Sequence, residues 1–102
     1  MIAAVIMMVG NPTGGGGGSA PTASFTWVPQ PAKQGTLISF INTSSGSDPK
    51  TFSWTIAGNQ FSTQENPTYY PSNFGTLVVG LTATNQYGSN TTSNNVGVMP
   101  AG

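Results

Sequence analysis

A chain of 102 residues has the length of one ordinary domain and leaves no room for a second. It contains no His and no Cys, its only basic residues are Lys33 and Lys50, its only acidic residues are Asp48 and Glu65, and its net charge is zero. This inventory argues against acid-base or nucleophilic catalysis, nucleic acid as a partner, and a dedicated zinc or calcium site. We therefore expect a protein that is not an enzyme and that carries no cofactor and no metal.

The chain begins with an unbroken apolar run from Met1 to Val9, which Gly10, Asn11 and Pro12 bring to a stop. A membrane-spanning helix needs roughly twenty apolar residues, so this run cannot span a bilayer, and no basic residue precedes it as in a secretory signal. Three interpretations remain: a truncated membrane anchor, the first buried strand, or a segment that docks into a partner subunit. We favour docking, because burial of each exposed apolar side chain would contribute ~1.5–3 kcal/mol. We name residues 1–12 the N-terminal arm, and its expected docking residues are Ile2, Val5, Ile6, Met7, Met8 and Val9.

A glycine run, Gly14–Gly18, follows Thr13 and precedes Ser19. Glycines have no side chains to pack and the greatest backbone freedom, so we assign residues 13–22 to a flexible tether. The remaining boundaries place a β-sandwich at residues 23–99 and a short tail at 100–102.

From Ala23 onward the apolar pattern has period two, which predicts strands. We expect strands at about residues 23–28, around 38–40, at 51–56 and near Phe61, with a turn at Gly58–Asn59. Residues 42–48 form a polar turn. The turn-like surroundings of Asp48 also argue against its acting with Glu65 as a glycosidase pair.

The longest alternation runs from Leu77 to Ala83, and a turn at 85–88 leads into a last strand at 91–98. No helical period persists, so the domain should be all-β and close into an antiparallel sandwich of about seven strands. The predicted core is Phe25, Ile38, Phe40, Phe52, Trp54, Ile56, Leu77, Val79, Leu81, Val96 and Val98.

Four ordered motifs resemble those of the polycystic kidney disease (PKD) domain family. They are Ala-Ser-Phe-Thr at 23–26, Ile-Ser-Phe-Ile-Asn-Thr-Ser at 38–44, Phe-Ser-Trp at 52–54, and Leu-Thr-Ala-Thr-Asn-Gln-Tyr-Gly-Ser at 81–89 after Gly75. The resemblance covers most of the chain and implies an immunoglobulin-like sandwich. Such domains are extracellular spacers or interaction modules in surface proteins, secreted enzymes and virion proteins.

The sequence departs from the family pattern at two places. After the tryptophan the family usually reads Asp-Phe-Gly-Asp-Gly, whereas residues 55–59 here read Thr-Ile-Ala-Gly-Asn. The acidic turn, with any calcium or polar network it makes, is therefore not expected. Pro71 stands where the family usually has a tyrosine, which argues against a tyrosine-corner hydrogen bond.

Two functions of different class are consistent with these features. The first is a structural virion protein, such as a capsid decoration or fibre-like subunit of a bacteriophage. It would be present in many copies, docked through the N-terminal arm, and located at the virion surface. The reason for this interpretation is that the sequence combines an extracellular type of domain with a starting Met and no secretion signal. The low net charge also favours association between copies. A pilin-like filament subunit ranks third, because its leading helix should be about twice as long.

The second function is an accessory module of a secreted or cell-surface protein that binds polysaccharide, such as a host-surface glycan, or another protein. Flat exposed aromatic side chains serve such contacts, although core packing explains each aromatic residue as well. The candidates are Trp27, Tyr69, Tyr70, Phe74 and Tyr87, and we place the expected contact surface at Tyr69 and Tyr70.

Overall fold

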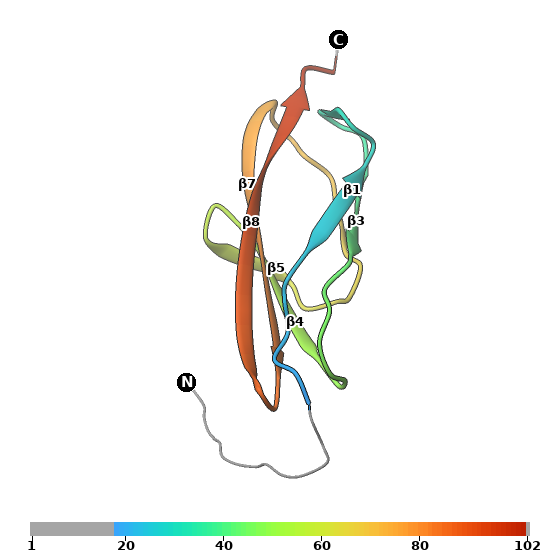
Figure 1. The fold of residues 1–102 in the computed structure, drawn as a ribbon. Coiled ribbons are helices and arrows are strands. Elements are labelled where there is room, and N and C mark those ends of the chain that lie inside the picture. The colour runs from blue at the N-terminus through green and yellow to red at the C-terminus, as the bar shows by residue number, and fades with distance from the viewer. Residues whose placement is uncertain (1–17, 102) are drawn as a thin grey trace.

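The computed structural model describes residues 18–101, which form two packed β-sheets with no helix (Figure 1). One sheet has three strands in the order β1-β3-β6, and the other has five in the order β2-β8-β7-β4-β5. The all-β, immunoglobulin-like sandwich predicted from the sequence is confirmed. The strands are β1 (Phe25–Val28), β2 (Ala32–Lys33), β3 (Ile38–Asn42), β4 (Thr51–Ile56), β5 (Asn59–Ser62), β6 (Thr68–Tyr69), β7 (Gly75–Asn85) and β8 (Gly88–Met99).

The hairpin of β7 and β8 runs the full length of the sandwich (Figure 1). Its register is regular from the Asn85–Gly88 pair at the turn to the Gly75–Val98 pair at the other end. A two-residue turn at Gln86–Tyr87 joins the strands, a length typical of tight hairpins. The hairpin therefore sets the distance between the two ends of the molecule.

The turn between β4 and β5 lies at Ala57–Gly58, one residue earlier than the sequence pattern predicted, and Asn59 already belongs to β5. Ala57 has φ 52° and Gly58 has φ 83°. A type I′ hairpin turn, one of the two types that match the strand twist, needs positive φ at both central residues. The geometry of the hairpin outweighs the preference of Ala57 for negative φ.

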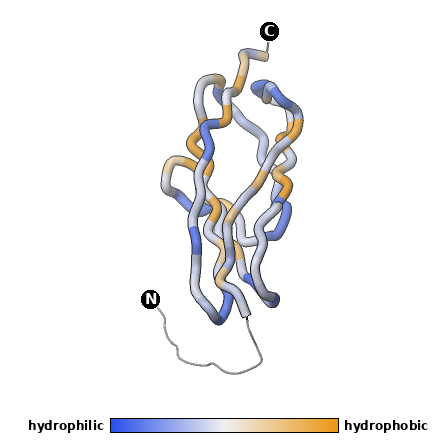
Figure 2. Tube along the Cα trace, viewed as in Figure 1, coloured by the Kyte–Doolittle hydropathy of each residue, from blue (hydrophilic) through white to orange (hydrophobic). Residues whose placement is uncertain are grey.

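Buried apolar side chains from both sheets fill the space between them, and Figure 2 shows hydrophilic residues in turns, at strand ends and along β8. Trp54 is fully buried, with ring centroids 5.0 Å from Phe25 and 5.5 Å from Phe40, and its Nε1 donates to the Gln64 carbonyl oxygen at 2.8 Å. The core consists of Ala23, Phe25, Ala32, Ile38, Phe40, Trp54, Val79, Leu81, Ala83, Val96 and Val98.

Three residues of the predicted core, Phe52, Ile56 and Leu77, are only partly buried and pack against its edge. Conversely, Ala32 is fully buried although it directly follows Pro29-Gln30-Pro31. It belongs to β2, which pairs in parallel with the end of β8. No helix among residues 18–101 is long and apolar enough to span a membrane.

Candidate functional site

The predicted docking residues of the N-terminal arm, Ile2, Val5, Ile6, Met7, Met8 and Val9, lie outside the described residues. Docking therefore stays a prediction. The structure shows at which end of the sandwich the described chain begins. We name this end the proximal end, and it consists of residues 18–22, the loop 43–50 and the turn 86–87. The chain joins the sandwich there, whereas the C-terminus leaves from the opposite, distal end (Figure 1).

Hydrogen bonds hold the chain where it joins the proximal end. The Ser19 amide donates to Oγ of Ser47 at 2.8 Å, and the Ser47 amide donates to the Ser19 carbonyl oxygen at 3.1 Å. Thr22 and Ser45 form an antiparallel bridge in which each amide donates to the other carbonyl oxygen at 3.0 Å. Residues 18–22, which the sequence assigned to the tether, are thus attached to the domain.

Asn85 links this attachment to the long hairpin. Its Nδ2 donates to the carbonyl oxygens of Ser19 at 2.8 Å and Ser47 at 2.9 Å, while its Oδ1 accepts the Tyr87 amide at 2.8 Å. The Tyr87 ring lies against Gly18 so closely that a Cβ there would be 1.9 Å from Cζ of the tyrosine. One asparagine therefore stabilises the turn and the root of the tether together.

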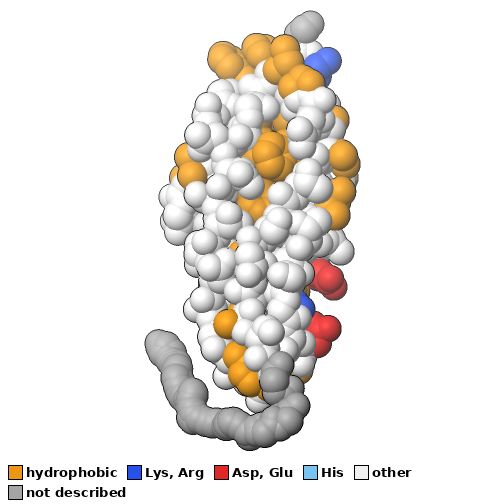
Figure 3. All heavy atoms as spheres, viewed as in Figure 1, with side chains coloured by type: hydrophobic (Ala, Val, Ile, Leu, Met, Phe, Trp, Pro, Cys, Tyr) orange, Lys and Arg blue, Asp and Glu red, His pale blue; other side chains and the backbone are white. Residues whose placement is uncertain are grey.

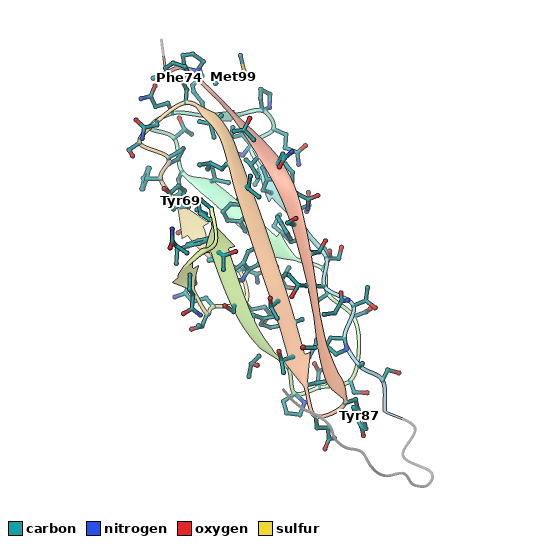
Figure 4. The ribbon with its side chains drawn as sticks, turned by 90° about the vertical axis from the view of Figure 1, so that its left-hand side faces the viewer. Tyr69, Phe74, Tyr87 and Met99 are labelled. Atoms are coloured by element: carbon teal, nitrogen blue, oxygen red, sulfur yellow. The ribbon has the colours of Figure 1, made fainter. Side chains whose placement is uncertain are left out.

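Exposed apolar side chains gather at the distal end, as Figure 3 shows. Because Gly75 pairs with Val98, Phe74 and Met99 lie next to each other just beyond that pair, and they are 63% and 50% exposed (Figure 4). We name this pair the distal cap, and its residues are Phe74 and Met99. Leu37 and Tyr70 adjoin the Ile38–Tyr69 pair and are also exposed. Because Ile38 and Val98 are both buried, alternation places Leu37 and Tyr70 on the outer face of the three-stranded sheet and the distal cap on the outer face of the five-stranded sheet.

The aromatic candidates do not form one surface. Tyr69 is half-buried, with its ring centroid 5.5 Å from that of Phe61, whereas Tyr70 is 65% exposed. Successive side chains of a strand point to opposite faces, so these two tyrosines face different surroundings. Trp27 is half-buried against the core, and Tyr87 lies at the proximal end, far from Phe74 (Figure 4).

Both carboxylates border one shallow hollow of about 460 Å³ near the proximal end. Asp48 pairs with Lys50 at 2.6 Å, and Glu65 lies on the same hollow, beside the partly buried Phe52. No pattern in the sequence indicates this proximity, which arises because the loops after β3 and β5 meet. Within residues 18–101 no group of three His, Cys, Asp or Glu side chains could hold a metal ion.

No protein-family model and no curated protein matches the sequence. Among solved structures, the PKD1 domain of Vibrio anguillarum Epp is similar, with a TM-score of 0.67 and 24% sequence identity over 81% of this chain and 98% of that chain. This similarity shows the fold, and the PKD-like architecture implied by the four sequence motifs is confirmed.

Proposed function

We propose that this PKD-like module is a non-catalytic structural and display protein of an extracellular assembly, anchored by its N-terminal arm. The observation that carries the proposal is the placement of the two ends (Figure 1). The described chain begins at the proximal end, where Gly18 lies against Tyr87, while apolar side chains are exposed at the distal end. A domain held by its proximal end presents its distal cap outward.

The hydrogen bonds of Ser19 support this role. A glycine tether alone would transmit no orientation, because its backbone is free. The bonds with Asn85 and Ser47 hold the chain to the domain from Ser19 onward. The long β7–β8 hairpin then carries the distal cap at a constant distance from the attachment point.

The ionisable groups also favour binding over catalysis. Lys50 pairs with Asp48, and the Asp48 side chain is 83% exposed. A carboxylate that acts as a general acid or base must be within hydrogen-bond reach of the reacting group. Asp48 is instead exposed to solvent and paired with Lys50.

Sedimentation velocity tests the anchoring role on the full-length chain, compared with a double variant, Ile6→Asp with Met8→Asp, that places two charges in the arm. We expect the wild type to associate and the variant to be monomeric with an arm open to protease. A monomeric wild type whose arm resists protease would mean that the arm packs on its own domain, which contradicts the proposal.

We place this assembly at a virion surface, as a capsid decoration or fibre-like protein present in many copies. The support is the nearly uncharged surface, rich in hydroxyl and amide side chains, which is typical of rigid extracellular β proteins. Quantitative mass spectrometry of purified virus particles from the source should find the chain at a fixed, high copy number. Recovery from the secreted fraction alone would contradict this location.

A polysaccharide-binding accessory module is the second candidate, and the hollow bordered by Asp48, Lys50 and Glu65 favours it. Its charged groups suit sugar hydroxyls, and Phe52 supplies an apolar wall. A glycan array would test it with wild type, Glu65→Gln at the hollow, Tyr70→Ala and the control Thr76→Ala on the outer face of β7. Binding lost only in Glu65→Gln supports a site at the hollow, whereas loss only in Tyr70→Ala or a wild type without signal argues against it.

A further inference from the structure

We infer that the outer edge of β8 pairs with the same edge of a second copy of this chain, with the two strands antiparallel. The inference rests on the proposed role in an assembly and deepens it, because it names the contact between neighbouring copies. We name residues 89–97 the β8 edge.

The β8 edge has no neighbouring strand on one side within residues 18–101. β2 lies next to β8 in the five-stranded sheet but pairs only with Val98 and Met99. The Met99 carbonyl oxygen accepts from the Gln34 amide, just after β2, and so points away from β7. Backbone direction alternates along an antiparallel strand, and the register of β7 with β8 is regular. The backbone groups of residues 89, 91, 93, 95 and 97 therefore also point away from β7.

The other edges of the described sandwich are short or interrupted, which is how natural sheets avoid association. β5 has four residues, and its pairing with β4 contains a register shift. β1 has four residues and ends before Pro29, while β6 has two residues between Pro67 and Pro71. The β8 edge, residues 89–97, has no charge, no proline and no shift in register. Among residues 18–101, it is the edge best suited to accept a strand.

Polar side chains on both faces of the β8 edge decide which strand fits it. The outer face carries Ser89, Thr91, Ser93 and Asn95, and the inner face carries Asn90, Thr92 and Asn94. The apolar N-terminal arm would find no apolar cover beside these groups. A second β8 edge instead places hydroxyl and amide groups opposite each other, where they can form hydrogen bonds. An uncharged edge also does not repel its own copy.

The pairing that uses the whole β8 edge is centred on Ser93. It places Ser93 opposite Ser93 of the partner subunit, Thr91 opposite Asn95, and Ser89 opposite Gly97, and each such pair exchanges two backbone hydrogen bonds. Because the strands run in opposite directions, the two proximal ends lie at opposite ends of the pair. Each arm then anchors to a different subunit, so the pair connects two anchoring sites. This arrangement fits the fibre-like form of the proposed assembly.

The pairing is weak by itself. Its backbone hydrogen bonds replace bonds to water, so the net gain from each is small, and it buries no large apolar side chain. Copies that their arms hold close together meet at a high effective concentration and pair, whereas dilute copies do not. An arm variant that is monomeric when dilute is therefore consistent with the pairing.

Cross-linking between introduced cysteines tests the pairing in the full-length chain, which has no cysteine of its own. Opposite residues of a hydrogen-bonded antiparallel pair have Cα atoms about 5.5 Å apart, within the range of a disulfide. Ser93→Cys therefore places two thiols within reach at the centre of the pair. The matched control is Thr84→Cys, at an exposed position on the outer face of β7 near the proximal end. In an antiparallel pair, position 84 lies far from its copy.

With oxidised glutathione as the oxidant, non-reducing electrophoresis measures the rate at which covalent dimers form in the assembled fraction. We expect Ser93→Cys to link about tenfold faster or more than Thr84→Cys, because paired thiols have a high effective concentration. Thr91→Cys and Asn95→Cys should each link slowly alone and fast when mixed. Circular dichroism and sedimentation velocity check that each variant folds and assembles like the wild type.

Equal rates for Ser93→Cys and Thr84→Cys in a normal assembly would overturn the pairing and leave the anchoring role in place. Thr91→Cys that links alone as fast as in the mixture would overturn the centring on Ser93. Adding Ile6→Asp and Met8→Asp to Ser93→Cys separates the two proposals, and we expect linking to fall to the rate of the control. Fast linking that persists would support the pairing and contradict anchoring by the arm. A wild type that stays monomeric at every concentration would overturn the pairing.

Discussion

Replacement of Trp54 should reveal how much of the stability depends on the centre of the sandwich. Trp54 is fully buried, packs its ring on Phe25 and Phe40, and donates Nε1 to the Gln64 carbonyl oxygen at 2.8 Å. Trp54→Ala removes the ring and leaves a cavity, for which we expect a loss of about 3–5 kcal/mol in the free energy of unfolding. Trp54→Phe keeps one ring but loses the hydrogen bond and some volume, for a loss of about 1–3 kcal/mol.

Urea denaturation followed by far-UV circular dichroism measures both losses. A domain of this size has a free energy of unfolding of about 4–13 kcal/mol, so Trp54→Ala should lie close to unfolding while Trp54→Phe stays measurable. Trp27→Phe is the matched control, because Trp27 is only half-buried at the edge of the core, and we expect it to cost less than about 1 kcal/mol. Equal losses for Trp54→Phe and Trp27→Phe would refute the assignment of Trp54 to the centre of the core.

Three further predictions concern the attachment and the sheet. Asn85→Ala should speed hydrogen exchange and proteolysis at residues 18–22 and cost about 1–3 kcal/mol, because it removes the bonds to Ser19 and Ser47; unchanged proteolysis would contradict this. Gly80→Ala should lower the free energy of unfolding by about 1–3 kcal/mol, because the added Cβ would lie 2.7 Å from Oγ1 of Thr55. The control is Gly97→Ala, whose added Cβ has nothing within 4 Å and should change the free energy of unfolding by less than about 0.5 kcal/mol. Neither calcium nor a chelator should shift the melting temperature, and a rise with calcium would reveal a site that the described residues do not show.

The strands and most of the core could be predicted because alternation along a strand is a local property. Leu81 and Val79 alternate with Gly80 and Thr82, and both are buried as expected. Residues beyond the reach of a neighbouring strand were less predictable. Leu77 follows the same alternation but lies beyond the Ile56–Val79 pair, where β4 no longer borders β7, and it is only partly buried.

The distal cap depends on pairing between distant segments, which alternation alone does not reveal. A signal for part of it was present, since counting outward from the Gln86–Tyr87 turn places Phe74 opposite Met99. Leu37 and Tyr70 come together through the pairing of β3 with β6, for which the sequence holds no comparable turn. The meeting of Asp48 and Glu65 at one hollow likewise follows from loop packing.

The central claim is that the N-terminal arm is covered by another molecule and not by its own domain. Hydrogen–deuterium exchange of the full-length protein, followed by mass spectrometry, measures this directly in assembled and diluted, monomeric fractions, with peptides from β7 as an internal reference. The amides of residues 2–9 should exchange slowly in the assembled fraction and fast in the monomer. Slow exchange that persists in the monomer, or fast exchange in both fractions, would contradict the account.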